Sequence, residues 1–338
     1  MIRVAINGFG RIGRTAMRIL CQSTTSDFQI VAINTRRKSQ PDQEQWIKEL
    51  CHRFKYDSIF GTFQGSIRPT SSGAQIGSHQ VIFCSHGDPA DCPWSELDID
   101  LVLECSGQFC SKQLASGHLT AGAKKVLISA PAKQVDATIV YGVNHQDLKA
   151  DDRVVSSASC TTNALAPIVQ TLDQNFGIEQ GLLTTVHAYT NDQNLVDGQH
   201  RDWRRARAAA LSMIPTKTGA AAAIEAILPS LAGKLNGQAV RVPTCNVSLI
   251  DLTVNLAQSP SLQELVDCFL QAASQPHAVL AVTDEPLVSV DFNQSCASCV
   301  IDLQQLQKVN NLYKVLAWYD NEWGFTQRLL DTAKVMMS

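Results

Sequence analysis

A glycine loop near the N-terminus restricts the possible folds more than any other segment of the chain. Residues 3–6 have a β-strand pattern, Gly8, Gly10 and Gly13 follow, and residues 14–20 continue as a helical pattern. This spacing permits a tight turn, close approach of the backbone to a pyrophosphate, and a phosphate bound at the helix N-terminus. The alternative is a glycine turn without a ligand, but the flanking strand and helix favour dinucleotide binding.

The order of apolar segments predicts an α/β chain with two domains. In the first half, short strand patterns at 2–6, 30–34, 99–105, 125–129, 138–143 and 153–156 alternate with helical segments such as 12–22, which is typical of a parallel Rossmann sheet. In the second half, strand patterns at 181–189, 239–256, 287–292, 299–303 and 313–319 have few helices between them. We therefore expect an α+β catalytic domain with a mixed or antiparallel sheet, beginning close to Cys160.

Composition excludes several functional classes. The 338 residues are 45% hydrophobic with a net charge of -3, which supports a large core and gives no sign of nucleic-acid binding. No apolar stretch reaches the roughly 18 residues of a membrane span and no signal peptide is visible, so we expect a cytoplasmic protein without a membrane partner. The 11 cysteines are scattered and Cys296 and Cys299 lack a second ligand pair, so we expect reduced thiols and no metal.

The segment after the second strand indicates which dinucleotide is bound. NAD enzymes place an acid there to hold the ribose 2′-hydroxyl, but this chain has Thr35, Arg36, Arg37 and Lys38. A hydroxyl and cations can accept a 2′-phosphate that a carboxylate would repel, so the sequence favours NADP over NAD. The alternative is a solvated basic loop.

Cys160 and His187 are the candidate nucleophile and base. Cys160 follows a strand pattern and a loop and opens a helical segment, where N–H groups favour the thiolate and can stabilise an oxyanion. Cys105, in contrast, lies in an apolar run typical of a core. His187 ends a strand pattern and could activate the thiol, although spacing alone does not establish that the two side chains meet.

Long ordered segments carry a family resemblance beyond these motifs. With Gly8 to Gly13, Ser159 to Asn163 and His187, the chain resembles the phosphorylating glyceraldehyde-3-phosphate dehydrogenase family. The match continues through 200–210, 214–221, 240–244 and 317–324, and so extends over nearly the whole chain.

The resemblance implies a domain organisation and a reaction. It implies a dinucleotide-binding domain of residues 1–159 with 320–338, which includes the C-terminal helix, and a catalytic domain of residues 160–319. It further implies a homotetramer with central contacts in the 188–207 loop. Cys160 would form a thiohemiacetal with the aldehyde, His187 would act as base, the nicotinamide would accept hydride, and inorganic phosphate would cleave the thioester.

The same resemblance assigns binding roles to further residues. The residues at the phosphate-binding positions are Ser159, Thr161, Thr190, Arg205, Thr218, Gly219 and Arg241. Those at the cofactor-binding positions are Gly8, Gly10, Arg11, Ile12, Gly13, Ser129 and Asn321, to which the NADP interpretation adds Thr35, Arg36 and Arg37. For part of the arginine cluster at 204–207, a charged subunit interface is the alternative.

The sequence departs from the family pattern where the adenosine should bind. Thr35 replaces the usual acid, residues 39–52 contain a polar insertion, Gly198 and Gln199 replace a Leu-Pro pair, and Gly87 replaces an arginine. Two rival functions are erythrose-4-phosphate dehydrogenase and a non-catalytic, nucleotide-responsive scaffold. The segments 189–192 and 216–219 favour the three-carbon substrate, and the catalytic residues argue against a scaffold.

Overall fold

The computed structural model describes residues 1–23, 27–37 and 42–338. The chain forms two compact units. The N-terminal unit comprises Met1–Ile139, Gln146–Ala158 and Leu329–Ser338, and the C-terminal unit comprises Val140–His145 and Ser159–Arg328. The functional assignment of residues 1–159 with 320–338 and of residues 160–319 as domains stays a prediction.

The elements of the N-terminal unit alternate between strands and helices along much of its length. Its strands are β1 (Ile2–Asn7), β2 (Phe28–Asn34), β3 (Ile67–Pro69), β4 (Gly73–Ile76), β5 (His79–Cys84), β6 (Leu101–Glu104), β7 (Lys125–Ile128), β8 (Ala137–Thr138) and β9 (Val154–Ser156). Its helices are α1 (Arg11–Gln22), α2 (Gln43–Lys55), α3 (Lys112–Ala115) and α4 (Gly117–Thr120), with the end of α8 (Trp323–Met336).

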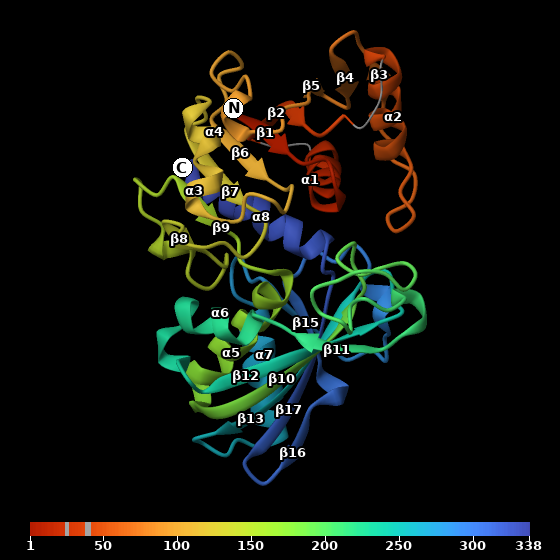
Figure 1. Cartoon of the computed structure of the whole chain (residues 1–338). Helices are drawn as coiled ribbons and strands as arrows, with labels where there is room; N and C mark the ends of the chain where they lie inside the picture. Colours follow the sequence, from red (N-terminus) through yellow and green to blue (C-terminus); the bar gives the residue numbers. More distant parts are fainter. Residues whose placement is uncertain (24–26, 38–41) are drawn as a thin grey trace. The chain divides into compact units, whose positions relative to one another are not determined.

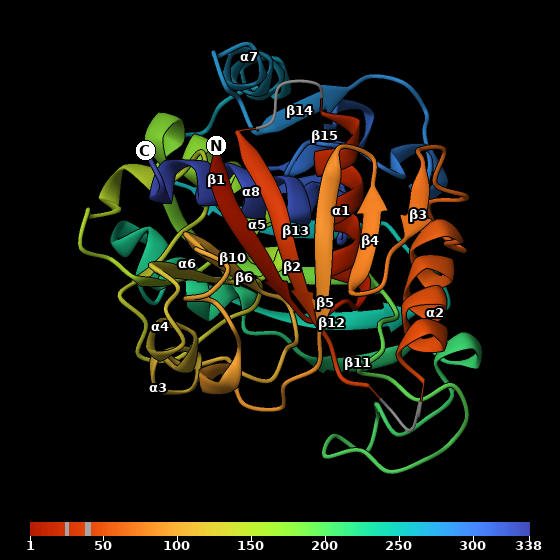
Figure 2. The same cartoon turned by 90° about the horizontal axis from the view of Figure 1, so that it is seen from above.

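The N-terminal sheet has the strand order of a Rossmann fold. Within the described residues, the nine strands are ordered β3-β4-β5-β2-β1-β6-β7-β9-β8 and run parallel from β5 to β8, while β3, β4 and β5 pair antiparallel (Figures 1 and 2). The order reverses at β1, where the glycine loop follows the strand. Ligands of open parallel sheets bind at such a reversal, which places the candidate cofactor site.

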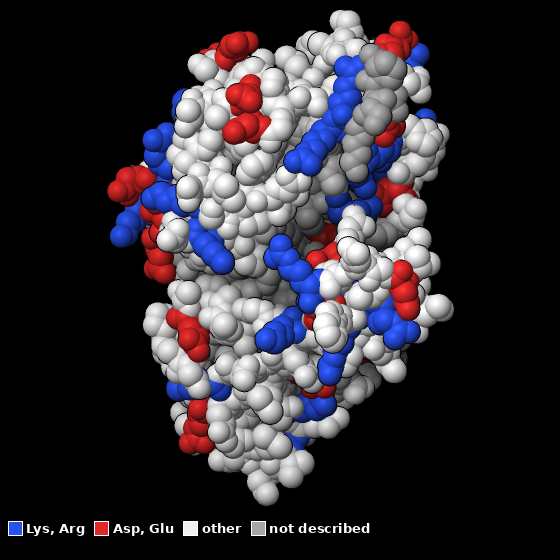
Figure 3. Space-filling view, in the orientation of Figure 1, with Lys and Arg blue, Asp and Glu red and all other residues white. Residues whose placement is uncertain are grey.

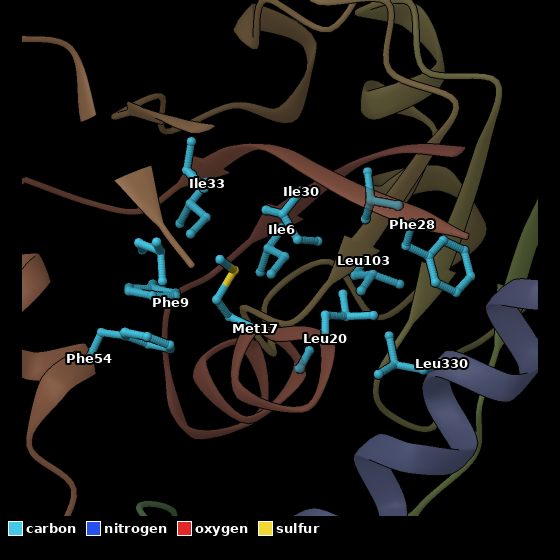
Figure 4. Close-up of a cluster of buried hydrophobic side chains, with 14 of the residues drawn as sticks. Ile6, Phe9, Met17, Leu20, Phe28, Ile30, Ile33, Phe54, Leu103 and Leu330 are labelled. Carbon is cyan, nitrogen blue, oxygen red and sulfur yellow. The ribbon is translucent and has the colours of Figure 1, made fainter. Parts of the chain in front are cut away.

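An apolar face of α1 explains why this helix packs on the sheet. Met17 and Leu20 are buried against Ile6 and Ile30 of the central strands, and Leu330 of α8 joins the same cluster (Figure 4). The opposite face of the sheet has its own core, in which Trp94 is fully buried. Burial on both faces is typical of a parallel sheet with crossover helices, and the α/β prediction is confirmed.

The C-terminal unit is built on a mixed sheet covered by helices. Its strands are β10 (Ile178–Ala188), β11 (Ile214–Lys217), β12 (Leu235–Val242), β13 (Ser248–Leu256), β14 (Leu280–Thr283), β15 (Cys299–Asp302), β16 (Gln307–Val309) and β17 (Leu312–Tyr319). Its helices are α5 (Cys160–Phe176), α6 (Ala220–Ile227) and α7 (Leu262–Ala273). β10 pairs parallel with β12 and antiparallel with β13, and β13 pairs antiparallel with β17 (Figure 1). The expected α+β unit with a mixed sheet is confirmed.

Three strand predictions were wrong in detail. The segment 239–256 contains two strands, β12 and β13, because the chain leaves the sheet after Val242 and passes through Val247 with a φ of 65°. Ser289–Phe292 is a 3-10 helix, with the Asp291 carboxylate accepting the Val288 N–H at 2.8 Å. Only Ala137–Thr138 of the region around 138–143 is a strand, and Gly142 turns with a φ of 87°.

The polar insertion expected at 39–52 is largely the helix α2. Asp42 caps it by accepting the Glu44 N–H at 3.1 Å, and its buried face carries Trp46, Ile47, Leu50, Cys51 and Phe54. The polar residues of the predicted insertion therefore form the solvent side of an amphipathic helix. The part of the predicted insertion at 39–41 lies outside the described residues, as does Lys38.

Candidate active site

The glycine loop of the N-terminal unit has no room for a side chain at two of its three glycines, Gly8 and Gly13. Gly8 has a φ of 100°, and a Cβ there would lie 2.6 Å from the Ser106 backbone. A Cβ on Gly13 would lie 2.2 Å from the Gly8 carbonyl oxygen, whereas one on Gly10 would meet no described atom within 4 Å. Gly10 is the N-cap of α1 and has no side chain, so space remains beside the first N–H groups of the helix. This cradle fits a pyrophosphate.

A pocket of the N-terminal unit begins at this loop and extends past the end of β2. Its lining residues include Gly8, Gly10, Thr35, Arg36, Arg53, His86, Gly87 and Gln108. The Arg36 guanidinium donates a hydrogen bond to Gln108 Oε1 at 3.1 Å. The Arg37 guanidinium instead lies 5.8 Å from the Trp46 ring centre, and Arg37 is absent from the described lining. Sequence reasoning missed Arg53, which reaches the pocket only because α2 is a helix.

The other predicted cofactor residues have structural contacts of their own. Arg11 forms an ion pair with Asp57 and its guanidinium lies 5.1 Å from the Phe60 ring centre. Ile12 packs against the core, so a role in cofactor binding would fall to its backbone. Ser129 directly follows β7, and its N–H donates to the Glu104 carbonyl at 3.0 Å.

Beneath the glycine loop lies a buried polar network that the sequence did not reveal. Trp94 Nε1 donates to His118 Nδ1 at 2.9 Å, and His118 Nε2 donates to the Glu104 carboxylate at 3.0 Å. Glu104 also accepts from the side chain of Asn7, whose amide oxygen accepts from Asn34 at 2.7 Å. The network joins the ends of β1, β2 and β6 under the loop.

Cys160 and His187 meet within the C-terminal unit. Cys160 is the first residue of α5, and His187 lies near the end of β10. The distance from Cys160 Sγ to His187 Nε2 is 3.5 Å. His187 Nδ1 lies 2.6 Å from the Ala188 carbonyl oxygen, which can only accept, so Nδ1 carries the proton and Nε2 faces the thiol as an acceptor. This arrangement allows the imidazole to take the thiol proton.

Burial and the Arg241 charge set the protonation states of the two groups. Burial, with the Arg241 charge, lowers the pKa of His187 from 6.5 to about 3, so the imidazole is neutral at physiological pH. Burial raises the pKa of the Cys160 thiol, opposed by the Arg241 charge and by N–H groups at the start of α5. The helix N-terminus was expected to favour the thiolate, and it does act in that direction, but burial outweighs it.

Two of the predicted phosphate-binding residues lie beside this pair. Arg241 is paired with His187 across β12 and β10, and its Nη1 donates to the Ala188 carbonyl at 3.0 Å and to Thr190 Oγ1 at 3.4 Å. Arg205 forms an ion pair with Asp192, and its Nε donates to Thr216 Oγ1 at 2.9 Å. Both guanidinium groups are thus held in place, and both lower the pKa of His187.

The remaining predicted phosphate-binding residues differ in how their side chains are engaged. Ser159 is the N-cap of α5, and its hydroxyl accepts the Thr162 N–H at 3.0 Å. Thr161 is buried with its hydroxyl 3.0 Å from the Tyr319 hydroxyl. Thr218 Oγ1 accepts the Ala220 N–H at 3.3 Å, and Gly219 is the N-cap of α6. A Cβ at Gly219 would meet no described atom within 4 Å, so its backbone is accessible.

Two buried residues of the segment 317–324 belong to the surroundings of the candidate active site. The buried Tyr319 hydroxyl lies 2.8 Å from Thr185 Oγ1, and its ring meets the His187 ring edge-on at 6.0 Å. Sequence reasoning did not assign Tyr319 a role, although it belongs to a segment that carried the resemblance. Asn321, expected to hold the nicotinamide carboxamide, is buried and its Oδ1 accepts from the Ser248 hydroxyl at 2.9 Å.

Membrane-spanning helices and clustered metal ligands are both absent from the described part of the chain. Residues 1–23, 27–37 and 42–338 contain no helix long and apolar enough to cross a membrane. The same residues contain no group of three or more His, Cys, Asp or Glu side chains that could hold a metal ion.

Comparison with known proteins covers both units. Residues 2–112 match the family model "Glyceraldehyde 3-phosphate dehydrogenase, NAD binding domain" and residues 159–321 match "Glyceraldehyde 3-phosphate dehydrogenase, C-terminal domain". The chain is 50% identical over 333 residues to a glyceraldehyde-3-phosphate dehydrogenase of Pseudomonas aeruginosa, covering 98% of this chain and 97% of that protein. It is 47% identical over 338 residues to the chloroplastic glyceraldehyde-3-phosphate dehydrogenase A of Chlamydomonas reinhardtii, covering 99% of this chain and 88% of that protein.

A Rossmann unit with a dinucleotide cradle, joined to a mixed-sheet unit, defines a nicotinamide-dinucleotide-dependent oxidoreductase. The matches identify it further. The chain belongs to the glyceraldehyde-3-phosphate dehydrogenase family, and the resemblance seen in the sequence is confirmed.

Proposed function

We propose that this family member oxidises D-glyceraldehyde 3-phosphate to 1,3-bisphosphoglycerate, using inorganic phosphate and NADP or NAD. One observation carries the proposal: Cys160 Sγ lies 3.5 Å from the unprotonated Nε2 of His187, whose other nitrogen is fixed by the Ala188 carbonyl. A thiol beside an oriented base can form covalent intermediates with a carbonyl substrate.

In the first half of the reaction, Cys160 Sγ attacks the aldehyde carbon and the thiol proton moves to His187 Nε2. The carbonyl oxygen takes that proton back and becomes the hydroxyl of a thiohemiacetal. N–H groups at the start of α5 would stabilise the oxygen while it is negative. The neutral state of His187 suits this role, because a base must be unprotonated when attack begins.

In the second half, the thiohemiacetal is oxidised and then cleaved. When bound, the nicotinamide ring supplies the hydride acceptor. His187 takes the hydroxyl proton, which leaves a thioester on Cys160. An oxygen of inorganic phosphate attacks the thioester carbon, the C–S bond breaks, and the proton on His187 returns to the sulfur. The proton of the attacking phosphate leaves to solvent.

Two phosphate groups must be held during this reaction. We assign these phosphate groups to the side chains of Arg241 and Arg205, and Thr190 lies beside Arg241. A guanidinium group can donate two parallel hydrogen bonds to two oxygens of one phosphate. Ser159, Thr161, Thr218 and Gly219 would add hydroxyl or backbone donors. Of these, Thr161 is the least accessible, because its hydroxyl is already bonded to Tyr319.

We further propose that NADP is used at least as well as NAD. Thr35 and Arg36 line the pocket beyond β2, and no Asp or Glu is among its described lining residues. A 2′-phosphate would therefore meet a hydroxyl and cations there, without a carboxylate to repel it. The dinucleotide would be bound by residues 1–159 with 320–338, and the chemistry would take place in residues 160–319.

The exposed apolar side chains between 195 and 213 support self-association of the chain, which the proposed homotetramer requires. Their exposed fractions are high in the single chain: Leu195 82%, Val196 71%, Trp203 87%, Leu211 86% and Met213 76%. Five large apolar residues in one segment are expected to be covered by another protein surface, which here would be a second copy of the chain. We assign the enzyme to the cytoplasm, in agreement with the low net charge and the many free thiols.

The deciding experiment is a set of initial rates on D-glyceraldehyde 3-phosphate and erythrose 4-phosphate, each with NADP and NAD and with or without phosphate. We expect phosphate-dependent reduction of the cofactor with the three-carbon aldehyde as the better substrate. A higher kcat/KM for erythrose 4-phosphate would instead support the rival dehydrogenase. No turnover on either aldehyde would support the scaffold.

A further inference from the structure

We propose that Arg53 of α2, together with Arg36, forms the subsite that binds the 2′-phosphate of NADP. This inference rests on the proposed binding of the dinucleotide in the N-terminal pocket. It assigns the discrimination between NADP and NAD in part to α2, a helix that is not part of the glycine motif. Both arginines line the same pocket as Gly8, Gly10 and Thr35. They come from the loop after β2 and from α2.

The position of the two arginines agrees with the general geometry of Rossmann sites. In such sites the pyrophosphate lies at the glycine loop, and the ribose 2′ position faces the residues after the second strand. Thr35 occupies the first of these positions here, and Arg36 follows it. Arg53 belongs to the same lining, so both arginine side chains are available to a phosphate on the 2′-hydroxyl.

Both guanidinium groups are oriented by weak partners that leave their charge available. Arg36 donates to the neutral Gln108 Oε1 at 3.1 Å. Arg53 pairs with Glu49 one helical turn earlier at 3.5 Å, in a contact whose side chains are 50% and 41% exposed. Exposed pairs of this kind contribute little net free energy, so a phosphate dianion can compete with Glu49 for Arg53.

The helix holds Arg53 in place through its own buried neighbours. Phe54 follows Arg53 directly and is fully buried, and Leu50 is buried one turn earlier. The Phe54 ring lies 5.9 Å from the ring of Phe9 in the glycine loop, so the loop and the end of α2 pack together. In Figure 3 the surface where Figure 1 draws α2 carries Lys and Arg side chains with Asp and Glu side chains among them.

Arg37 is assigned a different role. It was grouped with Arg36 on sequence, but its guanidinium lies over Trp46 of α2 at 5.8 Å and its N–H donates to the Ser85 hydroxyl at 2.9 Å. These contacts attach the loop after β2 to the helix. The second cation of the subsite is therefore distant in sequence from the first.

The test compares Arg53→Gln with Lys48→Gln in the full-length enzyme. Lys48 is on the same helix, pairs with Glu44 and is not among the described lining residues, so it matches the loss of charge. We measure the ratio of kcat/KM for NADP to kcat/KM for NAD, in which damage common to both cofactors cancels. Arg53→Gln should lower the ratio about tenfold, the effect of one charge-assisted hydrogen bond of roughly 1.4 kcal/mol, and Lys48→Gln should leave it unchanged.

Two further measurements strengthen the comparison. Adenosine 2′,5′-bisphosphate should inhibit Arg53→Gln about tenfold less well than wild type, while inhibition by adenosine 5′-monophosphate should be unchanged. Glu49→Gln should raise the NADP to NAD ratio, since it releases Arg53 from its carboxylate.

An unchanged ratio in Arg53→Gln, or an equal fall in Lys48→Gln, would overturn the assignment of Arg53. The proposed preference for NADP has a separate criterion, the ratio in wild type. A wild-type ratio below one, lowered further by Arg53→Gln, would refute the preference and retain the subsite.

Discussion

The helices α1 and α5 both begin directly after a strand and a short loop, but they differ in the residue that caps the first turn. At α1 the N-cap is Gly10, which has no side chain, and the loop before it has no room for one at Gly8. At α5 the N-cap is Ser159, whose hydroxyl accepts the Thr162 N–H, and the next residue is Cys160. An N-cap without a side chain leaves the first N–H groups of the helix open to an external anion, while the capped helix presents a reactive side chain at its first residue.

The largest effect expected from this difference between α1 and α5 is that of Cys160→Ser. The serine hydroxyl is a much weaker nucleophile at neutral pH, so turnover should fall by about 10⁴-fold or more. Cofactor affinity, which depends on the first turn of α1, should be unchanged in fluorescence titrations. Retention of full activity would eliminate Cys160 as the nucleophile. Iodoacetamide labelling with peptide mapping provides a control, because Cys160 should be the thiol whose modification follows inactivation.

His187→Asn should lower kcat by roughly 10²–10⁴-fold, the usual contribution of general acid–base catalysis, with cofactor affinity unchanged.

The same variant has an expected effect on stability at acid pH. Burial lowers the pKa of His187 from 6.5 to about 3, so its contribution to folding is present above pH 6.5 and decreases as pH falls towards 3. His187→Asn should therefore lose less stability than wild type between pH 6.5 and 4 in urea denaturation. Loss of cofactor affinity with normal kcat would contradict the assigned role.

Gly13→Ala should disturb the start of α1 and weaken cofactor binding. Its Cβ would lie 2.2 Å from the Gly8 carbonyl oxygen, so the loop must shift, at a cost of about 1–3 kcal/mol. We expect the cofactor Kd to rise roughly tenfold to a hundredfold, with the rate of Cys160 alkylation in the absence of cofactor unaltered. Gly10→Ala, where a Cβ has space, is the matched control and should keep the wild-type melting temperature. Equal melting temperatures for all three proteins would show that the close approach at Gly13 is unimportant.

Arg241→Gln should change the titration of the nucleophile. The Arg241 charge lowers the pKa of the Cys160 thiol by favouring the thiolate, so its removal should raise that pKa. The midpoint of the iodoacetamide rate against pH should move upward, and use of phosphate should weaken. A midpoint at the same or lower pH would show that Arg241 does not act on the sulfur.

The smallest effect is expected for Ser159→Ala. Loss of the cap should destabilise α5 by about 1 kcal/mol, while the nucleophile and base remain in place. Urea denaturation measures the stability, and a tenfold or greater fall in kcat without loss of stability would mean that Ser159 serves the reaction more than the helix.

Local signals were sufficient to predict the glycine loop and the position of Cys160. Each depends on a few consecutive residues whose conformational requirements are strong, such as Gly8 with its positive φ. The contact between Cys160 and His187 could be proposed but not established, because it depends on how β10 and α5 pack. Residues 289–292 were misassigned because a short apolar run does not distinguish a strand from a single helical turn.

Arg53 and Tyr319 were missed for a different reason. Arg53 directly follows the predicted polar insertion, for which no secondary structure was predicted, and its role depends on which face of α2 points at the pocket. Tyr319 resembles any buried aromatic residue of a core strand, and only the positions of Thr161 and Thr185 show that its hydroxyl supports the site. Side chains that act through distant partners leave little pattern in the sequence.

The N-terminal unit is completed by the last segment of the chain. Leu329–Ser338 belong to this unit, Leu330 lies in its core, and the Lys125 ammonium donates to the Met336 carbonyl at 2.7 Å. During synthesis on the ribosome, the first strands therefore emerge long before the helix that covers them. We expect the unit to remain incompletely folded until residues 329–338 have left the ribosome. A nascent chain stalled before residue 329 should be sensitive to proteases in its N-terminal unit, and a full-length released chain should not be.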